Sequence, residues 1–354
     1  MAAVVIYQRR WQSKCELQGI FMPKGQRLFH SLLLLALAAG FTPQALPQSS
    51  DPVHIVPAEK HEKPAGRAPE AGPPDRTKPI RVDVDLVLVP VTVVDAANRP
   101  VTSLEKQNFS LYEAGEPQTL QYFSTEDSPV SVGILLDLSS SMSDKIDTAR
   151  QALRQFFDNS NAEDDYFVIG FSDRPSLLAD STHSPQSIES KVALAVPYGH
   201  TALLDSIYMG LTKLRNARYK RRALVIISDG GDNHSRYTAR EIRELVQEAD
   251  VEIYALGIFS KVFKTYEEWA GKRLLTEITE ATGGRTITVN KLDELPEAAA
   301  AVSRELRNQY ILGYHPSHDI RDGRWRKIKV KAVADAIGRV LHVHSKQGYL
   351  APSR

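Results

Sequence analysis

The sequence has one cysteine and almost no net charge, and each shortage excludes a class of protein. A single cysteine among 354 residues can close no intramolecular disulfide and can build no thiolate metal centre alone. Lys plus Arg number 44 against 43 Asp plus Glu, so the net charge of +1 lacks the basic excess of a general nucleic-acid binder. Disulfide scaffolds, zinc ribbons and iron–sulfur proteins are therefore excluded, and the charge balance argues against a general nucleic-acid binder. The hydrophobic content of 42% is ordinary for a globular chain that buries a core.

Near the N-terminus lies an apolar run that is short for a membrane span. Residues 28–41 (LFHSLLLLALAAGF) follow Lys24 and Arg27, and small and turn-forming residues come after them. A basic start, an apolar middle of about 14 residues and a small-residue exit are the pattern of a secretory signal peptide. We therefore expect residues 1–47 to be a signal peptide, with Met22 as an alternative start, and the protein to be secreted, periplasmic or in the cell envelope. An uncleaved anchor, which would add a membrane contact, is the alternative.

Proline separates this leader from the folded part of the chain. Residues 48–79 contain seven prolines among charged residues, which is the composition of a disordered linker. Alternating apolar residues predict strands within 80–126, and three more follow within 309–354. Neither group has enough strands to be stable alone, so we expect the two to pair in one β-sandwich-like unit. Separate additions to the edges of a central sheet are the alternative. Asp322-Gly323 predicts a hairpin between the first two C-terminal strands.

Strands and helices alternate between these two groups. Continuous apolar runs such as 132–136 (VGILL) and 223–227 (ALVII) are typical of parallel strands that are covered on both faces. Helical stripes such as 145–157 separate them. This alternation predicts an α/β domain over residues 127–308, with a doubly wound, mostly parallel, Rossmann-like sheet and right-handed crossovers.

Oxygen-bearing side chains directly follow the predicted strands. Asp137, Ser139 and Ser141 come after the first strand, Thr201 opens a later helix, and Asp229 follows the next strand. Because a doubly wound sheet binds ligands beyond the carboxyl ends of its strands, we expect these oxygens to converge. Hard oxygen donors select Mg²⁺, Mn²⁺ or Ca²⁺ over zinc or copper. The sequence therefore predicts a metal site with an open coordination position.

The order and spacing of these residues resemble a known family. D-x-S-x-S after the first strand, a later Thr and an Asp in S/T-D-G form the metal-ion-dependent adhesion site of von Willebrand factor A (VWA) domains, and every element is present here. The resemblance covers residues 129–307. The flanking segments QYILGYHP (309–316) and GYLAP (348–352) resemble a group of secreted acidobacterial proteins that carry such domains.

This resemblance implies capture of a protein ligand rather than catalysis. It implies that the hydroxyls of Ser139, Ser141 and Thr201 hold Mg²⁺, with Mn²⁺ or Ca²⁺ as substitutes. It also implies that Asp137 and Asp229 supply charge and orient waters. An acidic side chain of the partner would then complete the octahedron. We therefore expect an exported adhesion protein and not an enzyme.

Other residues near these motifs have simpler interpretations. His200 and His234 flank the predicted site and are interpreted as ordinary loop residues, with protonation that tunes binding as the alternative. Asp232 and Asn233 fit a turn, with membership of a wider site as the alternative. Asp205 either forms a hydrogen bond to a group of the metal loop or lies on a solvated helix face.

Two other functions stay open. The sequence contains no G-x-S-x-G, no H-E-x-x-H and no P-loop, so a metal-dependent hydrolase is disfavoured. A structural VWA scaffold of an envelope complex, without a metal-dependent ligand, is the other alternative. Taken alone, Ser139 to Ser141 also fit a helix N-cap.

Overall fold

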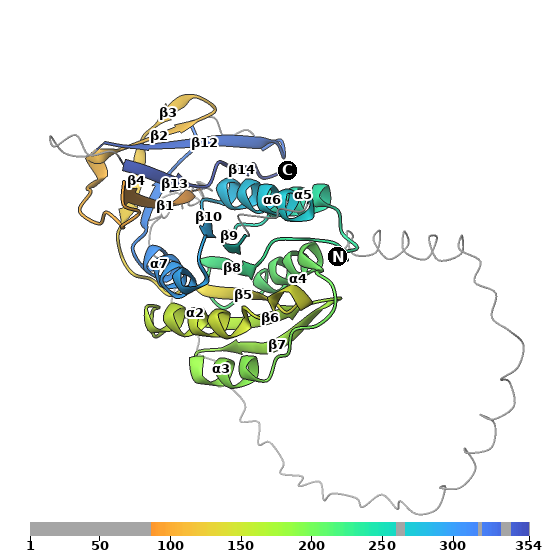
Figure 1. Cartoon of the computed structure of the whole chain (residues 1–354). Helices are drawn as coiled ribbons and strands as arrows, with labels where there is room; N and C mark the ends of the chain where they lie inside the picture. Colours follow the sequence, from red (N-terminus) through yellow and green to blue (C-terminus); the bar gives the residue numbers. More distant parts are fainter. Residues whose placement is uncertain (1–85, 260–265, 318–320, 334–340, 354) are drawn as a thin grey trace, which may run out of the picture. The chain divides into compact units, whose positions relative to one another are not determined.

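The computed structural model describes residues 86–259, 266–317, 321–333 and 341–353, all within one unit that spans 78–354 (Figure 1). The expected signal peptide and linker lie outside the described residues, as does the start of the first predicted strand. Among the residues that are described, no helix is long and apolar enough to cross a bilayer.

A six-stranded sheet forms the centre of the α/β part. Its strands, in spatial order, are β10 (Thr286–Val289), β9 (Glu252–Ile258), β8 (Arg222–Ser228), β5 (Ser131–Asp137), β6 (Asp165–Phe171) and β7 (Pro175–Thr182). The pairs from β10 to β6 are parallel, and β7 joins β6 as an antiparallel edge strand. The fold class predicted from the sequence is thereby confirmed.

Helices cover both faces of this sheet (Figure 1). One face packs against α2 (Ile146–Asp158), α3 (Pro185–Ala193) and α7 (Leu295–Arg307), and the other against α4 (Leu203–Leu214), α5 (Ala239–Glu248) and α6 (Tyr266–Thr282). Ile134 and Leu136 belong to the first core and Leu135 to the second, as the period of two along a strand requires.

The sequence analysis predicted neither β7 nor α3. Most residues of β7 are exposed or half-buried, because an edge strand packs only one face against the domain. The strand therefore lacks the continuous apolar run by which the central strands were found. Helix α3 is short and buries only Ile188 and Val192, so its apolar stripe is too brief to show a helical period.

Two four-stranded antiparallel sheets pack together as a sandwich beside the α/β part. One sheet has the order β13 (Leu341–Ser345), β1 (Val87–Asp95), β11 (Tyr310–Tyr314), β4 (Leu120–Ser124), and the other β14 (Gly348–Leu350), β12 (Trp325–Ala332), β2 (Phe109–Glu113), β3 (Glu116–Gln118). Both sheets combine N-terminal with C-terminal strands, and their inner faces share one apolar core around Phe109 and Tyr310, whose ring centroids lie 4.9 Å apart.

The predicted hairpin at Asp322-Gly323 is wrong. The strands on either side of it, β11 and β12, belong to different sheets. Strand β11 already has β1 and β4 as its two neighbours, so no edge of it is left for β12. The Asp-Gly pair does bend the chain, with Gly323 at a φ of 68°, but a turn residue does not determine the partner of the next strand.

Buried polar groups lie where the amino ends of the central strands meet the sandwich. The Gln309 amide donates to both oxygens of Glu252 at 2.9 and 2.7 Å, and its own oxygen accepts from Arg221 at 2.9 Å. Burial raises the pKa of Glu252 to about 7, although the Gln309 hydrogen bonds and the Arg221 charge act in the opposite direction. At this end of the sheet, the buried Glu252 carboxylate thus has donors arranged around it.

Candidate metal site

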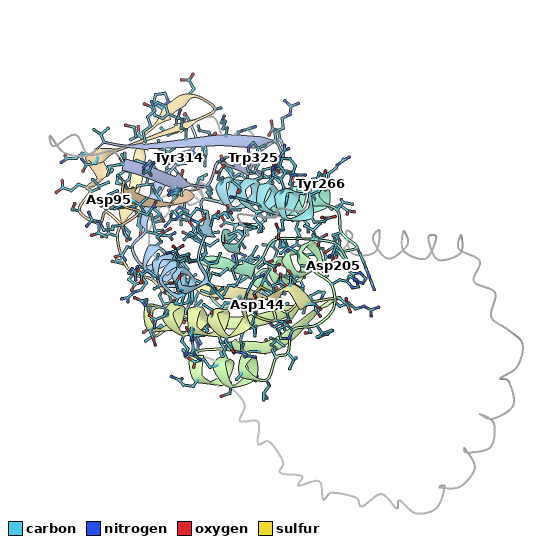
Figure 2. The ribbon with its side chains drawn as sticks, in the orientation of Figure 1. Asp95, Asp144, Asp205, Tyr266, Tyr314 and Trp325 are labelled. Atoms are coloured by element: carbon cyan, nitrogen blue, oxygen red, sulfur yellow. The ribbon has the colours of Figure 1, made fainter. Side chains whose placement is uncertain are left out.

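The direction in which the chain adds strands reverses between the two middle strands of the central sheet, β8 and β5. The chain winds outward from β5 to β6 and later from β8 to β9, so the loops after β5 and β8 diverge. In doubly wound sheets, ligands bind in the crevice that forms at such a point. Asp137 ends β5, Asp229 directly follows β8, and Thr201 lies just before α4. Figure 2 shows the side chains around these elements, with Asp205 of α4 and Tyr266 of α6 labelled.

The loop after β5 brings two serine hydroxyls together. Asp137 Oδ1 accepts a hydrogen bond from the Ser139 amide at 2.9 Å, and the hydroxyls of Ser139 and Ser141 lie 3.1 Å apart. Met142, fully buried, anchors the loop. Ser139 makes no side-chain capping bond to the short helix that follows, and α2 begins after Lys145. A capping role therefore does not explain this pair of hydroxyls.

Two carboxylates share this edge. Asp137 is fully buried and Asp229 is 8% exposed. Burial and, next, the negative charge of Asp229 raise the pKa of Asp137 to about 6. The Ser228 hydroxyl donates to Asp137 Oδ2 at 2.6 Å. Lys145 Nζ lies 2.8 Å from Asp229 Oδ2 and donates to the Ser141 carbonyl at 2.8 Å. The Lys145 ammonium thus pairs with Asp229, and among the described residues no hydrogen bond or ion pair joins it to Asp137.

The contacts that join Thr201 to the other loops run through its backbone. Its amide donates to Asn233 Oδ1 at 2.9 Å, and its carbonyl accepts from the amides of Asn233 and His234 at 3.1 and 3.2 Å. The Ser140 amide donates to the Gly199 carbonyl at 3.1 Å and so links the serine loop to the Thr201 segment. The buried Thr201 is thereby held between the loops that carry Asp137 and Asp229.

Asp232 and Asp205 both hold the loop after β8 against the start of α4. Asp232 Oδ1 accepts from the Leu204 amide at 3.3 Å and from the Ser235 hydroxyl at 2.5 Å. Asp205 Oδ1 accepts from the backbone amides of residues 236 and 237 at 2.8 and 3.1 Å. Of the two interpretations of Asp205, the hydrogen bond to a loop of the site is therefore the one found, and the solvated helix face is wrong.

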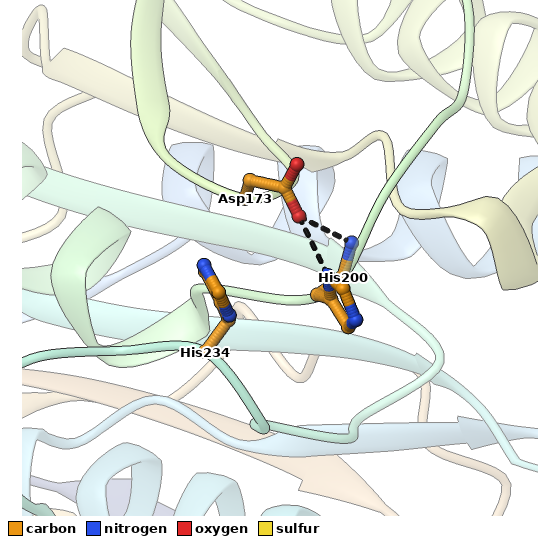
Figure 3. Close-up of side chains that lie close together, drawn as sticks. All are labelled: Asp173, His200 and His234. Atoms are coloured by element: carbon orange, nitrogen blue, oxygen red, sulfur yellow. Dashed lines mark hydrogen bonds and ion pairs between the residues drawn. The ribbon is translucent and has the colours of Figure 1, made fainter.

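Sequence reasoning missed two residues of this site and misplaced two more. Lys145 was not singled out, although it stands four positions after Ser141, and Ser228 was noted only as part of the S-D-G motif. His200 and His234 stand far apart in the sequence, yet their rings stack with centroids 4.9 Å apart (Figure 3). Folding alone brings such loop residues together.

The donor set fits a hard divalent cation. Three hydroxyls and two carboxylates are oxygen ligands of the kind that Mg²⁺ and Ca²⁺ take, and the described part of the site includes no sulfur donor. The buried negative charge of Asp137 also lacks a full counter-charge, which a cation would supply.

Comparisons with known proteins agree with this architecture. Residues 132–231 match the family model of the von Willebrand factor type A domain. An uncharacterized protein of Borreliella burgdorferi is 24% identical over 181 residues, which cover 44% of this chain and 53% of that protein. This chain therefore spans about half the length of that curated relative.

Solved structures with a similar arrangement include a von Willebrand factor type A protein from Catenulispora acidiphila, 13% identical, with 75% of this chain and 74% of that chain covered at a TM-score of 0.44. The vWF domain of the type V pili tip protein Mfa5 from Porphyromonas gingivalis is 12% identical, with 50% and 94% covered at a TM-score of 0.40. The assignment rests on the sequence match, which includes Asp137, Thr201 and Asp229. Residues 132–231 are therefore similar in sequence to the von Willebrand factor type A domain.

Proposed function

We propose that the carboxyl edge of the central sheet binds a divalent cation, Mg²⁺ in the first place, and captures a protein partner through it. The observation that carries this proposal is the pair Asp137 and Asp229, one fully buried and one nearly so, with the Lys145 ammonium beside Asp229. Burying a carboxylate without a full counter-charge is costly. A cation at this place would remove that cost, and VWA domains are typically modules for protein interaction or adhesion.

Each of the five residues has a role in this proposal. The hydroxyls of Ser139, Ser141 and Thr201 hold the ion, and the carboxylates of Asp137 and Asp229 supply charge and orient waters. Mg²⁺ commonly retains waters when few protein ligands hold it. One of these positions would be open to an acidic side chain of the partner, so the ion would be shared between two proteins.

Lys145 acts as a competitor for this ion. Its ammonium lies 2.8 Å from Asp229 Oδ2 and donates to the Ser141 carbonyl. Like charges repel strongly at such distances in a partly buried site. Binding of a divalent cation would therefore require Lys145 to withdraw from Asp229, and partner affinity would depend on this exchange.

The surface around the site suits an acidic side chain with apolar neighbours. Tyr198, whose amide donates to the Leu138 carbonyl at 2.7 Å, is 60% exposed. On the other side, α6 approaches so closely that a Cβ at Gly271 would meet the Gly230 carbonyl oxygen at 1.4 Å. The same helix exposes 51% of Trp269. Exposed aromatic residues are common anchors at protein interfaces.

The place of action that we propose is outside the cytoplasm, in the envelope or beyond it, which rests on the signal-peptide pattern of residues 1–47. We propose binding without turnover, because VWA domains are typically modules for protein interaction or adhesion. A structural scaffold that ignores the ion would instead bind its partner equally well after the metal is removed.

The experiment is a pair of measurements on parent, Asp137→Ala and Ser143→Ala proteins. Mg²⁺ or Mn²⁺ should raise the thermal midpoint of the parent and of Ser143→Ala, whose hydroxyl donates to the Ser140 carbonyl, but not of Asp137→Ala. A pull-down from envelope extract should recover a protein with metal and lose it with EDTA or with Asp137→Ala. An unchanged metal response in Asp137→Ala would refute the site.

Chemical blocking of carboxylates in the extract tests the partner's side of the contact. Carbodiimide with glycinamide converts accessible carboxylates to neutral amides. Capture by the untreated VWA protein should then disappear, whereas lysine acetylation of the extract should leave capture intact. Equal capture after carboxylate blocking contradicts an acidic ligand.

A further inference from the structure

We propose that Asp173, His200 and His234 form a second metal site, which takes a borderline transition-metal ion of the Zn²⁺ class. This site lies beside the oxygen site, uses different residues and does not depend on the function proposed above. Nitrogen ligands from two imidazoles with one carboxylate favour zinc, cobalt, nickel or copper over magnesium.

The three side chains converge from three loops (Figure 3). One ligand atom from each residue lies within 4.8 Å of the other two. His200 Nδ1 and Asp173 Oδ1 are 2.8 Å apart. The two imidazole rings stack with centroids 4.9 Å apart and planes inclined by 13°. Both rings therefore stand beside the same carboxylate, one of them already in contact with it.

These separations are close to those that zinc imposes. A tetrahedral zinc ion with bonds of about 2.0–2.2 Å holds its ligand atoms about 3.4 Å apart. The separations within 4.8 Å must therefore contract by at most about 1.4 Å. The stacked rings must also rotate to direct a nitrogen of each at one ion. His200 is 64% and Asp173 43% exposed at the side chain, so rotations are open to them.

The backbone positions the carboxylate of Asp173 beneath the His200 loop. Gly199 has a φ of +70°, and a Cβ on it would meet Asp173 Oδ1 at 2.6 Å, so a glycine is needed for this approach. The His200 amide also donates to Asp173 Oδ1 at 2.8 Å. Hydrogen bonds that orient a ligating group in this way are a regular feature of metal sites.

Three protein ligands leave a fourth tetrahedral position for water or for a group from outside. The ion would also connect the segment after β6, the segment before α4 and the loop after β8. Thr201 lies directly after His200, and its carbonyl accepts from the His234 amide at 3.2 Å. Zinc would therefore restrain Thr201, and any resulting effect on Mg²⁺ affinity rests on the proposed function.

The test is a titration of the tag-free, metal-stripped protein with Zn²⁺ and, for a spectroscopic signal, with Co²⁺. The parent should bind one ion at this site and give the visible absorption of low-coordinate Co²⁺. His200→Ala and His234→Ala should each bind at least about tenfold more weakly and lose that absorption. His315→Ala, an exposed histidine of the sandwich, is the matched control and should bind like the parent.

Two outcomes overturn the proposal: His200→Ala and His234→Ala bind Zn²⁺ as the parent does, or the parent does not bind it at micromolar concentration. Asp137→Ala separates the two sites. It should keep the Co²⁺ absorption while losing the Mg²⁺ response. If Asp137→Ala loses the Co²⁺ absorption although its circular dichroism is unchanged, the ion sits in the oxygen site and the second site does not exist.

Discussion

The two ends of the central sheet bury carboxylates in opposite ways. At the amino end, Glu252 receives two hydrogen bonds from Gln309, which in turn accepts one from Arg221. At the carboxyl end, the charge of Asp229 raises the pKa of Asp137, and Lys145 forms an ion pair with Asp229. At the amino end the chain itself supplies the donors for the buried carboxylate. At the carboxyl end the two carboxylates carry more negative charge than Lys145 balances.

The difference teaches where to look for function in this fold. A buried acid whose donors come from neighbouring elements joins parts of the structure, so its loss affects stability. A buried acid beside a second acid is unfavourable for stability and is explained by something that binds there. Removing the Gln309 donors at one end and the Asp137 charge at the other should therefore change the free energy of unfolding of the metal-free protein in opposite directions.

The largest effect is expected at the amino end. Gln309→Leu leaves the Glu252 carboxylate buried without its two donors, and at pH 8 it should lower the free energy of unfolding by about 3–4 kcal/mol. Urea unfolding measures this, with the exposed Gln155→Leu as control, expected within about 0.5 kcal/mol of the parent. Mg²⁺ affinity should not change. If Gln309→Leu loses no more stability than the Gln155→Leu control, the proposed role of the Gln309–Glu252 hydrogen bonds is contradicted.

The same carboxylate should contribute to the pH dependence of stability, alongside Asp137, whose raised pKa acts with the same sign. The pKa of Glu252 is raised from 4.5 to about 7 in the folded state, so the native protein retains a proton that the unfolded chain releases. The contribution of Glu252 to stability therefore falls as pH rises from about 4.5 through about 7, by about 3 kcal/mol. Urea midpoints between pH 5 and pH 8 compare the parent with Glu252→Gln, which should be flatter. If the urea midpoints of the parent and of Glu252→Gln change equally with pH, Glu252 is not a source of the pH dependence.

At the carboxyl end, removing a carboxylate should raise the free energy of unfolding of the metal-free protein. Asp137→Asn removes a buried charge next to Asp229, so the metal-free protein should gain about 1 kcal/mol at pH 8. The stabilisation by Mg²⁺, about 2.7 kcal/mol for the parent at a hundredfold excess over Kd, should vanish. Chemical unfolding with and without Mg²⁺ measures both. A metal-free Asp137→Asn protein that is strongly destabilised would show that this end, too, is structural.

The smallest effect concerns Lys145. Lys145→Met removes the ammonium that occupies Asp229, so Mg²⁺ should bind about tenfold more tightly, which corresponds to about 1.4 kcal/mol. The metal-free protein should lose about 1 kcal/mol, because Asp229 then has no cationic partner at that position. Isothermal titration measures the affinity, and Lys191→Met on the exposed face of α3 is the control. Weaker Mg²⁺ binding would mean that Lys145 supports the ion instead of competing with it.

Much of this arrangement could be predicted from the sequence. The central strands were visible because burial on both faces requires continuous apolar runs, and Asp137, Ser139 and Ser141 follow one of them at a spacing that a tight loop can direct inward. The rule that ligands bind at the carboxyl ends of strands then placed Thr201 and Asp229 at the same edge. These are local patterns with a direct physical cause.

The remainder depends on contacts between distant segments. Edge strand β7 has no continuous apolar run, and the hairpin at Asp322-Gly323 was mispredicted because strand pairing is decided by available sheet edges. His200 and His234 come together only when two loops fold against Thr201. The partnership of Lys145 with Asp229 likewise spans 84 positions and leaves no mark in the sequence around either residue.

The central claim is that one cation lies among the side-chain oxygens of Ser139, Ser141 and Thr201, with Asp137 and Asp229 behind them. Crystals grown with Mn²⁺ and measured at a wavelength where manganese scatters anomalously test it most directly. We predict an anomalous peak within bonding distance of the three hydroxyls, with Lys145 displaced from Asp229. Saturating Mn²⁺ with no peak among these oxygens, and with the Lys145–Asp229 ion pair intact, would contradict the account.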